Sequence, residues 1–379
     1  MQSNLIKLIK NAEVYTPDYI GKKDILIGGD KILAIDNSIE TGKIPTQIIN
    51  AKGKIITPGF IDQHIHLTGA GGKHSFSSMT PEISADELIN CGTTTALGML
   101  GTDGVTRSLE SLYAKVCSLT EQGLTAYMLT GYFGYPSISL LKSTMDDMVF
   151  IDKVIGCKIA ISDERASFPT ENEMLKILRQ VYVGGMTSGK GGILHVHLGA
   201  LESGMTMLLD IVKKYNFPIR YISPTHVGRT KQLFEQAIDF AKKGGMIDIS
   251  TGGTKYDLPY KQVIYAVENG VSLDNITFSS DGNAGMMKKD KATGIIQLYK
   301  APIHLNLEQV ILLIKEANWP LEKALKLITT NPARNLSLKN KGKINVGFDA
   351  DLCMFDSEYN LTDVFAKGKI FMKDGELQN

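Results

Sequence analysis

The fold is decided by the stretch Pro58-Gly59-Phe60-Ile61-Asp62-Gln63-His64-Ile65-His66. It has the pattern of a buried β-strand that ends in two histidines. Residues i and i+2 of a strand face the same side, so His64 and His66 are expected to point the same way. Imidazole is a good zinc ligand, and this pair is therefore a candidate metal site, although such pairs also occur as purely structural residues.

The long middle of the chain alternates short apolar runs with longer helical patterns, at intervals of roughly 25–45 residues. One such helical pattern is 230–243, which is apolar along one face. Strands that alternate with helices indicate a parallel sheet. Eight candidate strands end near His66, Gly101, Gly131, Ile161, His197, His226, Ser250 and Asp281. Eight units predict an α/β fold, a closed (β/α)8 TIM barrel, with its chemistry at the C-terminal ends of the strands.

Both ends of the chain have a different pattern. Short strand-like runs bounded by Gly and Asp turn signals occur at 5–9, 23–27, 351–355 and 368–372. We therefore predict a small β-sandwich domain assembled from both termini, residues 1–54 and 341–379, around a barrel at residues 55–340.

Composition excludes several classes of partner. The 379 residues are 43% hydrophobic, and 41 Lys and Arg residues balance 40 Asp and Glu residues, so charge gives no reason to expect nucleic acid or an anionic membrane. No apolar run reaches the ~18 residues of a membrane span, and the N-terminus lacks the pattern of a signal peptide. The four cysteines are scattered without a CxxC pair, which favours a reducing cytoplasm over a disulfide framework.

Three further strand ends carry possible metal ligands. His195 and His197 end the fifth strand; His197 is nearer the end and is the better ligand candidate, whereas His195 is expected to be packed or to support a ligand. His226 ends the sixth strand. Asp281 ends the eighth strand, where an Asp-Gly pair indicates either a turn or a carboxylate that binds metal and accepts a proton.

Lys158 interrupts the apolar strand 156–162. An unpaired charge in a buried strand is costly, so this lysine needs either a partner or a modification. Its position alone does not decide between the two.

Together these strand ends resemble the amidohydrolase superfamily and, within it, the isoaspartyl (β-aspartyl) dipeptidases. The resemblance covers essentially the whole chain. Matching segments are Gly101-Thr102-Asp103, Met128-Leu129-Thr130-Gly131, Ile155-Gly156-Cys157-Lys158, Ile161-Ser162-Asp163-Glu164-Arg165, Pro224-Thr225-His226-Val227-Gly228-Arg229, Ser279-Ser280-Asp281-Gly282-Asn283 and the tail Thr330-Asn331-Pro332-Ala333-Arg334.

The resemblance implies two zinc ions and a bridging hydroxide. His64 and His66 would hold one ion, His197 and His226 the other, and Lys158, carboxylated on its amine, would bridge them. Asp281 would complete the first site and would accept and return the proton of the attacking water.

The resemblance also implies a substrate site. Arg165 and Arg229 match the family's substrate-binding arginines, whose guanidinium groups suit carboxylates. Gly71 and Thr102 match positions that line the same pocket.

Three positions depart from the dipeptidase pattern. Lys73 stands where the family has a glutamate that grips the substrate's ammonium group, and Phe133 stands where it has a tyrosine that polarises the carbonyl. Gly285 stands where it has a serine. Either of the neighbouring tyrosines, Tyr132 and Tyr135, would substitute for the missing tyrosine if the loop is rearranged.

The predicted function is zinc-dependent hydrolysis of an amide in a small carboxylate-bearing substrate, foremost a β-aspartyl dipeptide. The alternative is another amide, either an N-acyl amino acid or a cyclic amide such as a hydantoin or dihydroorotate, which the cationic Lys73 would favour. A non-catalytic binding scaffold is a third reading, against which the complete ligand set argues. The resemblance suggests a homo-oligomer.

Overall fold

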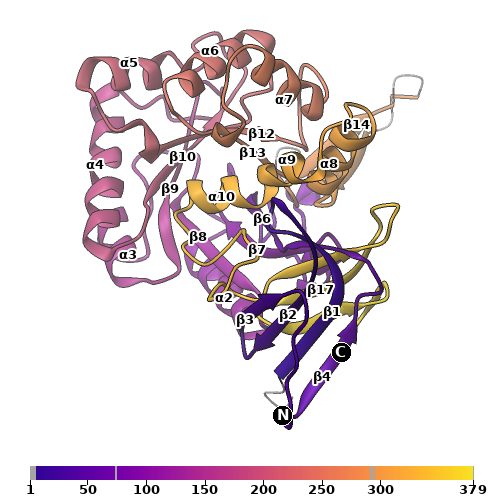
Figure 1. Ribbon diagram of the computed structural model, residues 1–379. Helices are drawn as coiled ribbons and strands as arrows, with labels where there is room; N and C mark the ends of the chain where they lie inside the picture. The colour runs from indigo at the N-terminus through magenta and orange to yellow at the C-terminus, as the bar shows by residue number, and fades with distance from the viewer. Residues whose placement is uncertain (1–5, 73–74, 291–292, 295, 379) are drawn as a thin grey trace.

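Eight parallel strands form a barrel in the computed structural model, which describes residues 6–72, 75–290, 293–294 and 296–378. Each strand pairs with the next in chain order, and Ile65 of the first strand bridges Gly282 just after the last, which nearly closes the barrel. The strands are β6 (Phe60–Ile65), β7 (Thr93–Gly98), β8 (Thr125–Gly131), β9 (Val154–Ile161), β10 (Ile193–Leu198), β11 (Ile222–Thr225), β12 (Ile247–Ser250) and β13 (Ile276–Ser279). The predicted barrel is confirmed (Figure 1).

Helices cover the outside of the barrel (Figure 1). They are α1 (Ala85–Ile89), α2 (Leu109–Glu121), α3 (Thr144–Phe150), α4 (Glu171–Ser188), α5 (Thr206–Tyr215), α6 (Lys231–Lys242), α7 (Pro259–Glu268), α8 (Leu305–Lys315), α9 (Leu321–Leu325) and α10 (Thr330–Asn335), with short 3-10 turns at Phe76–Ser78, Ile219–Tyr221, Leu273–Asn275 and Lys326–Ile328. Within the described ranges, no helix is long and apolar enough to cross a membrane.

Helix α6 shows why the sequence folds this way locally. The Thr230 hydroxyl accepts a hydrogen bond from the Leu233 backbone N–H at 3.1 Å and so caps the helix. Leu233, Phe234 and Phe240 are buried on the face that packs against the barrel. The helix expected at 230–243 is therefore present, and its apolar face provides the stabilising burial.

Strands from both termini form one nine-stranded sheet. It contains β1 (Ile6–Tyr15), β2 (Tyr19–Gly28), β3 (Lys31–Asp36), β4 (Thr46–Asn50), β5 (Ile55–Pro58), β16 (Leu352–Phe355), β17 (Leu361–Ala366), β18 (Lys369–Lys373) and β19 (Glu376–Leu377). β5 pairs with β1 from one end of the chain and with β16 from the other. By its hydrogen bonds β5 thus belongs to this sheet, and the first barrel strand, β6, begins at Phe60.

Lys341 joins the barrel to the terminal sheet. Its buried ammonium group donates to Thr125 Oγ1 at the start of β8 and pairs with Asp349 and Asp351 at 2.7 and 2.5 Å. These carboxylates precede β16. The two parts of the molecule are therefore held together by a buried ion cluster as well as by apolar packing.

The barrel's last loop carries a hairpin that the sequence analysis did not anticipate. Its strands are β14 (Gly285–Lys289) and β15 (Ile296–Lys300), and they pair antiparallel beyond β13. Gly285 begins the hairpin next to the Gly71 backbone. The hairpin therefore forms one wall of the barrel's C-terminal opening.

Candidate metal centre

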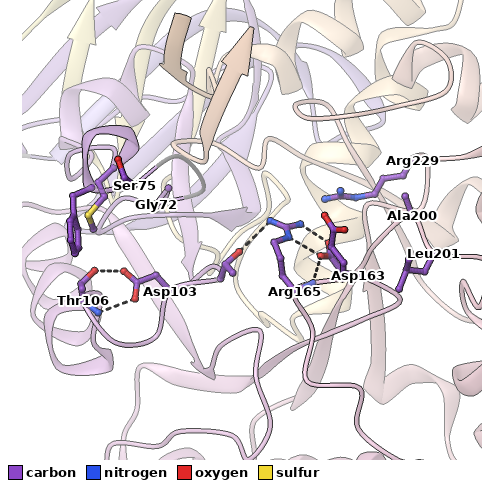
Figure 2. Close-up of a pocket in the computed structure, with 14 residues that line it drawn as sticks. Gly72, Ser75, Asp103, Thr106, Asp163, Arg165, Ala200, Leu201 and Arg229 are labelled. Atoms are coloured by element: carbon purple, nitrogen blue, oxygen red, sulfur yellow. Dashed lines mark hydrogen bonds and ion pairs between the residues drawn. The ribbon is translucent and has the colours of Figure 1, made fainter. Parts of the chain in front are cut away.

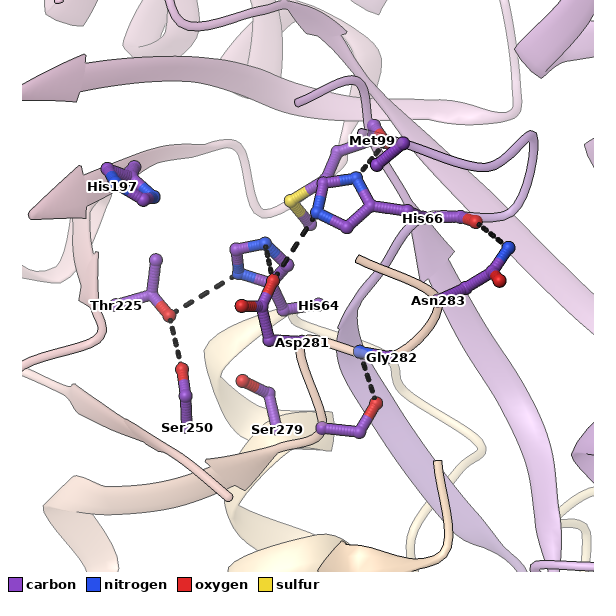
Figure 3. A network of polar contacts seen from close by, with 12 residues as sticks. His64, His66, Met99, His197, Thr225, Ser250, Ser279, Asp281, Gly282 and Asn283 are labelled. Atoms are coloured by element: carbon purple, nitrogen blue, oxygen red, sulfur yellow. Dashed lines mark hydrogen bonds and ion pairs between the residues drawn. The ribbon is translucent and has the colours of Figure 1, made fainter. Parts of the chain in front are cut away.

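Histidine and carboxylate groups converge at the C-terminal end of the barrel. Nε2 of His64 and Nε2 of His66 lie 3.4 and 3.3 Å from Oδ1 of Asp281. A nitrogen of His226 joins this group, because ligand atoms of His64, His226 and Asp281 all lie within 4.8 Å of one another. Figure 3 shows His64 and His66 pointing at the Asp281 carboxylate. Imidazole nitrogens and a carboxylate in one buried cluster fit a zinc-like ion.

Two of these residues have an unusual backbone. His226 follows β11 with φ of 61°, and Asp281 follows β13 with φ of 50°. Side-chain-bearing residues rarely adopt this left-handed conformation, and it concentrates at functional sites. In each case the chain turns sharply at the strand end and directs the side chain into the barrel mouth.

Burial sets the protonation of the cluster. Desolvation, reinforced by nearby positive groups, holds the pKa values of His64 and His226 well below the ordinary histidine value. Burial raises the pKa of Asp281, but His226, His66 and Arg229 outweigh that effect and leave it lowered. His64 and His226 are therefore neutral and Asp281 is ionised, which are the forms that bind metal.

Lys158 on β9 is fully buried within this cluster. Its Nζ lies 3.3 Å from His64 Nε2 and 3.2 Å from Met99 Sδ. Burial lowers the pKa of Lys158 to about 7. Much of the side chain is therefore an uncharged amine near neutral pH, the state in which a lysine acts as a nucleophile.

His197 on β10 lies beside His226, with ring centroids 4.5 Å apart. Its Nε2 lies 3.0 Å from Asp163 Oδ2. Asp163 also binds Arg165 through both carboxylate oxygens. Sequence reasoning missed Asp163, although its place two residues after β9 was a usable signal.

His195 has the supporting position expected for it. Its Nε2 lies 3.0 Å from Nδ1 of His64, on the side of that ring away from Asp281. Ser250, which sequence reasoning did not single out, lies 2.5 Å from His226 Nδ1. Such contacts orient ligand histidines.

A cavity of about 940 Å³ opens beside the cluster. Arg165 and Arg229 both line it (Figure 2). Gly71 and Thr102 are also among its lining residues. Arg165 is neutralised by Asp163 and also donates to Thr102 Oγ1 at 3.3 Å. A smaller cavity of about 90 Å³ shares these four residues and reaches His66, His197 and Asp281.

Arg229 differs from Arg165 in that no carboxylate of the described residues lies within ion-pair distance of it, although Asp281 and Asp163 act on it from further away. Within the described part of the chain its side chain makes no hydrogen bond or ion pair, and its Nε is buried without a partner. Burial lowers its pKa from the ordinary arginine value. A buried guanidinium without an acceptor is costly, and an anionic ligand would remove that cost.

Two of the three positions that depart from the dipeptidase pattern, Phe133 and Gly285, line the smaller cavity. Tyr132 lines neither cavity, because its ring packs against Gly104 and Gly134, so a role for it would need the loop to rearrange. Gly285 lies against Gly71, where a side chain would meet the Gly71 backbone. Lys73 is outside the described residues.

A (β/α)8 barrel with histidines and an aspartate at its strand ends defines the class of barrel hydrolases. The sequence model of the Amidohydrolase family matches residues 55–245 and 260–371. The chain belongs to this family, and it is a hydrolase.

Two solved structures illustrate what this chain is similar to. The crystal structure of β-aspartyl dipeptidase from Fervidobacterium islandicum AW-1, in complex with β-Asp-Leu dipeptide, is 42% identical with a TM-score of 0.94, over 100% of this chain and 99% of that chain. A D-hydantoinase structure is 20% identical, with a TM-score of 0.67 over 98% and 96% of the two chains, and shares the fold.

Curated relatives are more distant. Dihydroorotase from Staphylococcus epidermidis is 23% identical over 93% of this chain and 89% of its own length. Adenine deaminase from Thermosipho melanesiensis is 25% identical, and the match spans 59% of its length. The proteins that resemble this chain thus differ in activity, since they comprise a dipeptidase, a hydantoinase, a dihydroorotase and a deaminase.

Proposed function

We propose that this protein is a metal-dependent amide hydrolase that acts on β-aspartyl dipeptides. The observation that carries the proposal is Arg229, a partly buried guanidinium whose Nε has no hydrogen-bond partner and which lines a cavity that also reaches Asp281 and His66. A β-aspartyl dipeptide presents carboxylates next to its scissile amide. The 42% identical dipeptidase that was solved with β-Asp-Leu supports the same substrate.

The metal ligands in this proposal are those implied by the resemblance. His64, His66 and Asp281 would hold one zinc ion, and His197 and His226 a second, with Lys158 between them. Two bound ions would lower the pKa of a water and polarise the scissile carbonyl.

Lys158 would bridge the ions as a carbamate. Its uncharged amine attacks the carbon of CO2, one C–N bond forms, and the amine proton is released to solvent. The product carries a carboxylate in place of a cation. This change removes the cost of a buried ammonium group, and it explains why a lysine stands in a fully buried strand.

Asp281 would move the proton. Its lowered pKa keeps it ionised and able to accept a proton from the attacking water. The same carboxyl group then delivers that proton to the nitrogen of the leaving amine as the C–N bond breaks. Its contacts with His64 and His66 hold it at the reacting centre.

Substrate binding would divide between the two arginines. Arg229 would take one carboxylate directly, because its side chain donates no hydrogen bond within the described residues and its Nε is buried without a partner. Arg165, held by Asp163, would offer its remaining N–H groups to a second. The substrate's ammonium group would be left to the acidic residues of the cavity, Glu164 and Asp103, since Lys73 replaces the family's glutamate.

Two measurements test the proposal. Elemental analysis of the purified protein is expected to show about two zinc ions per chain, and a chelator should abolish activity that Zn²⁺ with bicarbonate restores. A hydrolysis screen of β-Asp-Leu, α-Asp-Leu, N-acetyl-aspartate, dihydroorotate and hydantoin is expected to favour β-Asp-Leu. A metal-free active enzyme, or no turnover of any amide, would contradict the proposal.

One observation favours the alternative substrate class. Phe133 and Gly285 leave the small cavity without the hydroxyl groups expected in a dipeptidase, and in the sequence Lys73 stands where the resemblance implies a glutamate. An N-acyl amino acid has a carboxylate for Arg229 but no ammonium group. Preferential turnover of N-acetyl-aspartate over β-Asp-Leu would establish that reading.

A further inference from the structure

The ring of His64 faces different partners at its two nitrogens. Nε2 faces Asp281 and Lys158, at 3.4 and 3.3 Å. Nδ1 faces His195 Nε2 at 3.0 Å and Thr225 Oγ1 at 3.4 Å. A neutral imidazole carries one hydrogen, so a metal ion can use Nε2 only when that hydrogen is on Nδ1.

Thr225 decides where that hydrogen lies. Its hydroxyl group donates its one hydrogen to Oδ2 of Asp248 at 2.6 Å, because a carboxylate can only accept. Towards His64 the Thr225 oxygen therefore presents only lone pairs. Nδ1 of His64 must then be the donor, which leaves the lone pair of Nε2 directed at the metal centre.

Asp248 on β12 is a completely buried acceptor. Besides Thr225, it accepts hydrogen bonds from Gln63 Nε2 at 2.8 Å, Thr277 Oγ1 at 2.8 Å and Ser279 Oγ at 2.6 Å. Burial raises the pKa of Asp248, and these four bonds oppose that rise. Asp248 lines neither of the two cavities described above, and all its named partners are hydrogen-bond donors.

His195, the second neighbour of His64 Nδ1, is also compatible with a hydrogen on that nitrogen. If His64 donates to His195 Nε2, the hydrogen of His195 lies on its Nδ1, which is 3.2 Å from Ser223 Oγ. Ser223 also accepts from Asn335 Nδ2 at 3.0 Å. One hydroxyl oxygen can accept two bonds, so the whole chain of contacts is satisfied without a conflict.

We infer that Asp248 is a positioning residue that fixes His64 as the Nδ1–H tautomer through Thr225 and thereby makes its Nε2 available to a metal ion. It touches neither substrate nor reacting atoms. The inference rests on the proposed metal centre. It adds Asp248 as a residue that controls metal affinity without binding the metal, from a strand that carries none of the proposed ligands.

Asp248→Asn is the informative variant because it keeps the shape. Asn335 Nδ2 donates to Gln63 Oε1 at 2.8 Å, which fixes Gln63 with its Nε2 towards Asp248. The oxygen of the new amide must face that donor, so its NH2 group faces Thr225. Thr225 then accepts from the amide and donates to His64, which moves the ring hydrogen to Nε2. A buried Asp→Asn change that selects the wrong histidine tautomer is a known cause of large losses in serine proteases.

We expect Asp248→Asn to weaken Zn²⁺ binding by about 10–100-fold in a chelator competition, the usual effect of losing a residue that orients a ligand. Nitrogen-15 NMR of labelled histidines in the metal-free protein should show the hydrogen of His64 moving from Nδ1 to Nε2. The control is Asp147→Asn, another fully buried aspartate, which accepts from the Thr130 hydroxyl at 2.7 Å and from the backbone N–H groups of Leu140 and Leu141, with no histidine among these donors. It should lower the melting temperature and leave Zn²⁺ affinity unchanged.

A double variant separates this role from a general loss of packing. Thr225→Val removes the hydroxyl group through which Asp248→Asn would reverse the hydrogen bond to His64. In that background, Asp248→Asn should therefore add little further loss of Zn²⁺ affinity. Equal losses in the two backgrounds, or an unchanged His64 tautomer in Asp248→Asn, would overturn the inference. A parent protein that binds no Zn²⁺ but whose His64 tautomer switches in Asp248→Asn would contradict the proposed function and support the tautomer assignment.

Discussion

The ring of Phe133 lies 4.2 Å from the ring of His197, measured between centroids and tilted by 45°. The same ring lies 5.2 Å from the Arg165 guanidinium. A purely apolar side chain thus stands between a candidate metal ligand and a candidate substrate-binding arginine. It can pack against a substrate there but cannot donate a hydrogen bond to a carbonyl oxygen.

Restoring a hydroxyl at this position is the first prediction. Phe133→Tyr should raise kcat for β-Asp-Leu, because a donor to a developing oxyanion is typically worth ~10²–10³ in turnover. Steady-state kinetics would measure the change, and Phe133→Leu serves as the control that alters packing alone. A Tyr variant no faster than the parent would mean that another group already polarises the carbonyl.

Arg229 provides the second prediction. Arg229→Lys keeps the charge but loses the two-pronged geometry, so kcat/KM for carboxylate-bearing amides should fall by about 10–100-fold, equivalent to ~1.5–3 kcal/mol for a charged hydrogen bond. A substrate analogue with that carboxylate amidated should show little difference between parent and variant. Equal losses for both substrates would assign Arg229 to the architecture of the site instead.

The third prediction concerns Lys73 and rests on its charge alone, since it lies outside the described residues. Lys73→Glu should raise turnover of β-aspartyl dipeptides, which carry an ammonium group, and lower that of N-acetyl-aspartate, which does not. Lys73→Gln separates removal of repulsion from gain of attraction. Unchanged relative rates for the two substrates would remove Lys73 from the specificity argument.

The fourth prediction concerns stability and pH. Burial lowers the pKa of Lys341, but its pairs with Asp351 and Asp349 outweigh this and leave it raised. The pKa of Asp349 is lowered, because Lys341 and Lys31 outweigh burial. Asp349 contributes stability above its unfolded pKa of ~3.9, and this stability is lost as the pH falls through the lowered pKa of the folded state. Lys341 contributes stability below its unfolded pKa of ~10.4, and this stability is lost as the pH rises through the raised pKa of the folded state.

Lys341→Met should therefore reduce the free energy of unfolding by about 3–5 kcal/mol between pH ~4 and ~10, since it leaves a buried carboxylate unpaired. The difference from the parent should shrink towards both extremes. Denaturant unfolding across pH measures it. Lys326→Met, which breaks an exposed 3.5 Å pair with Asp274, is the control and should cost at most ~1 kcal/mol. A pH-independent difference would show that packing, not charge, holds the junction.

The sequence was enough to predict the barrel and the strand ends where candidate ligands gather. Periodicity marks strands and helices locally, and chemistry in this fold lies at strand ends by geometry. His64, His66, His226 and Asp281 could therefore be chosen before any coordinates existed, and the structure brings them together. Their functional roles remain proposals.

The contacts beneath the ligands could not be predicted in the same way. Asp163, Asp248 and Asn335 look in sequence like ordinary polar residues after a strand, within a strand and at the end of a helix. Their partners come from segments far along the chain, such as Gln63 with Asp248. Periodicity carries no information on which side chains meet across a barrel. The hairpin at β14 and β15 was missed because its strands project from a loop and are mostly exposed.

The pairing of β5 with β16 has a consequence for how the chain is made. Thr57 lies opposite Cys353, so the sheet that the first strands begin is completed only after the ribosome has synthesised the entire barrel. At ~5–20 residues per second this interval lasts on the order of tens of seconds. Throughout it, one edge of β5 has no neighbour and offers a template for strands of other nascent chains. Demand for a chaperone should therefore be greatest during translation, before Leu352–Phe355 emerge.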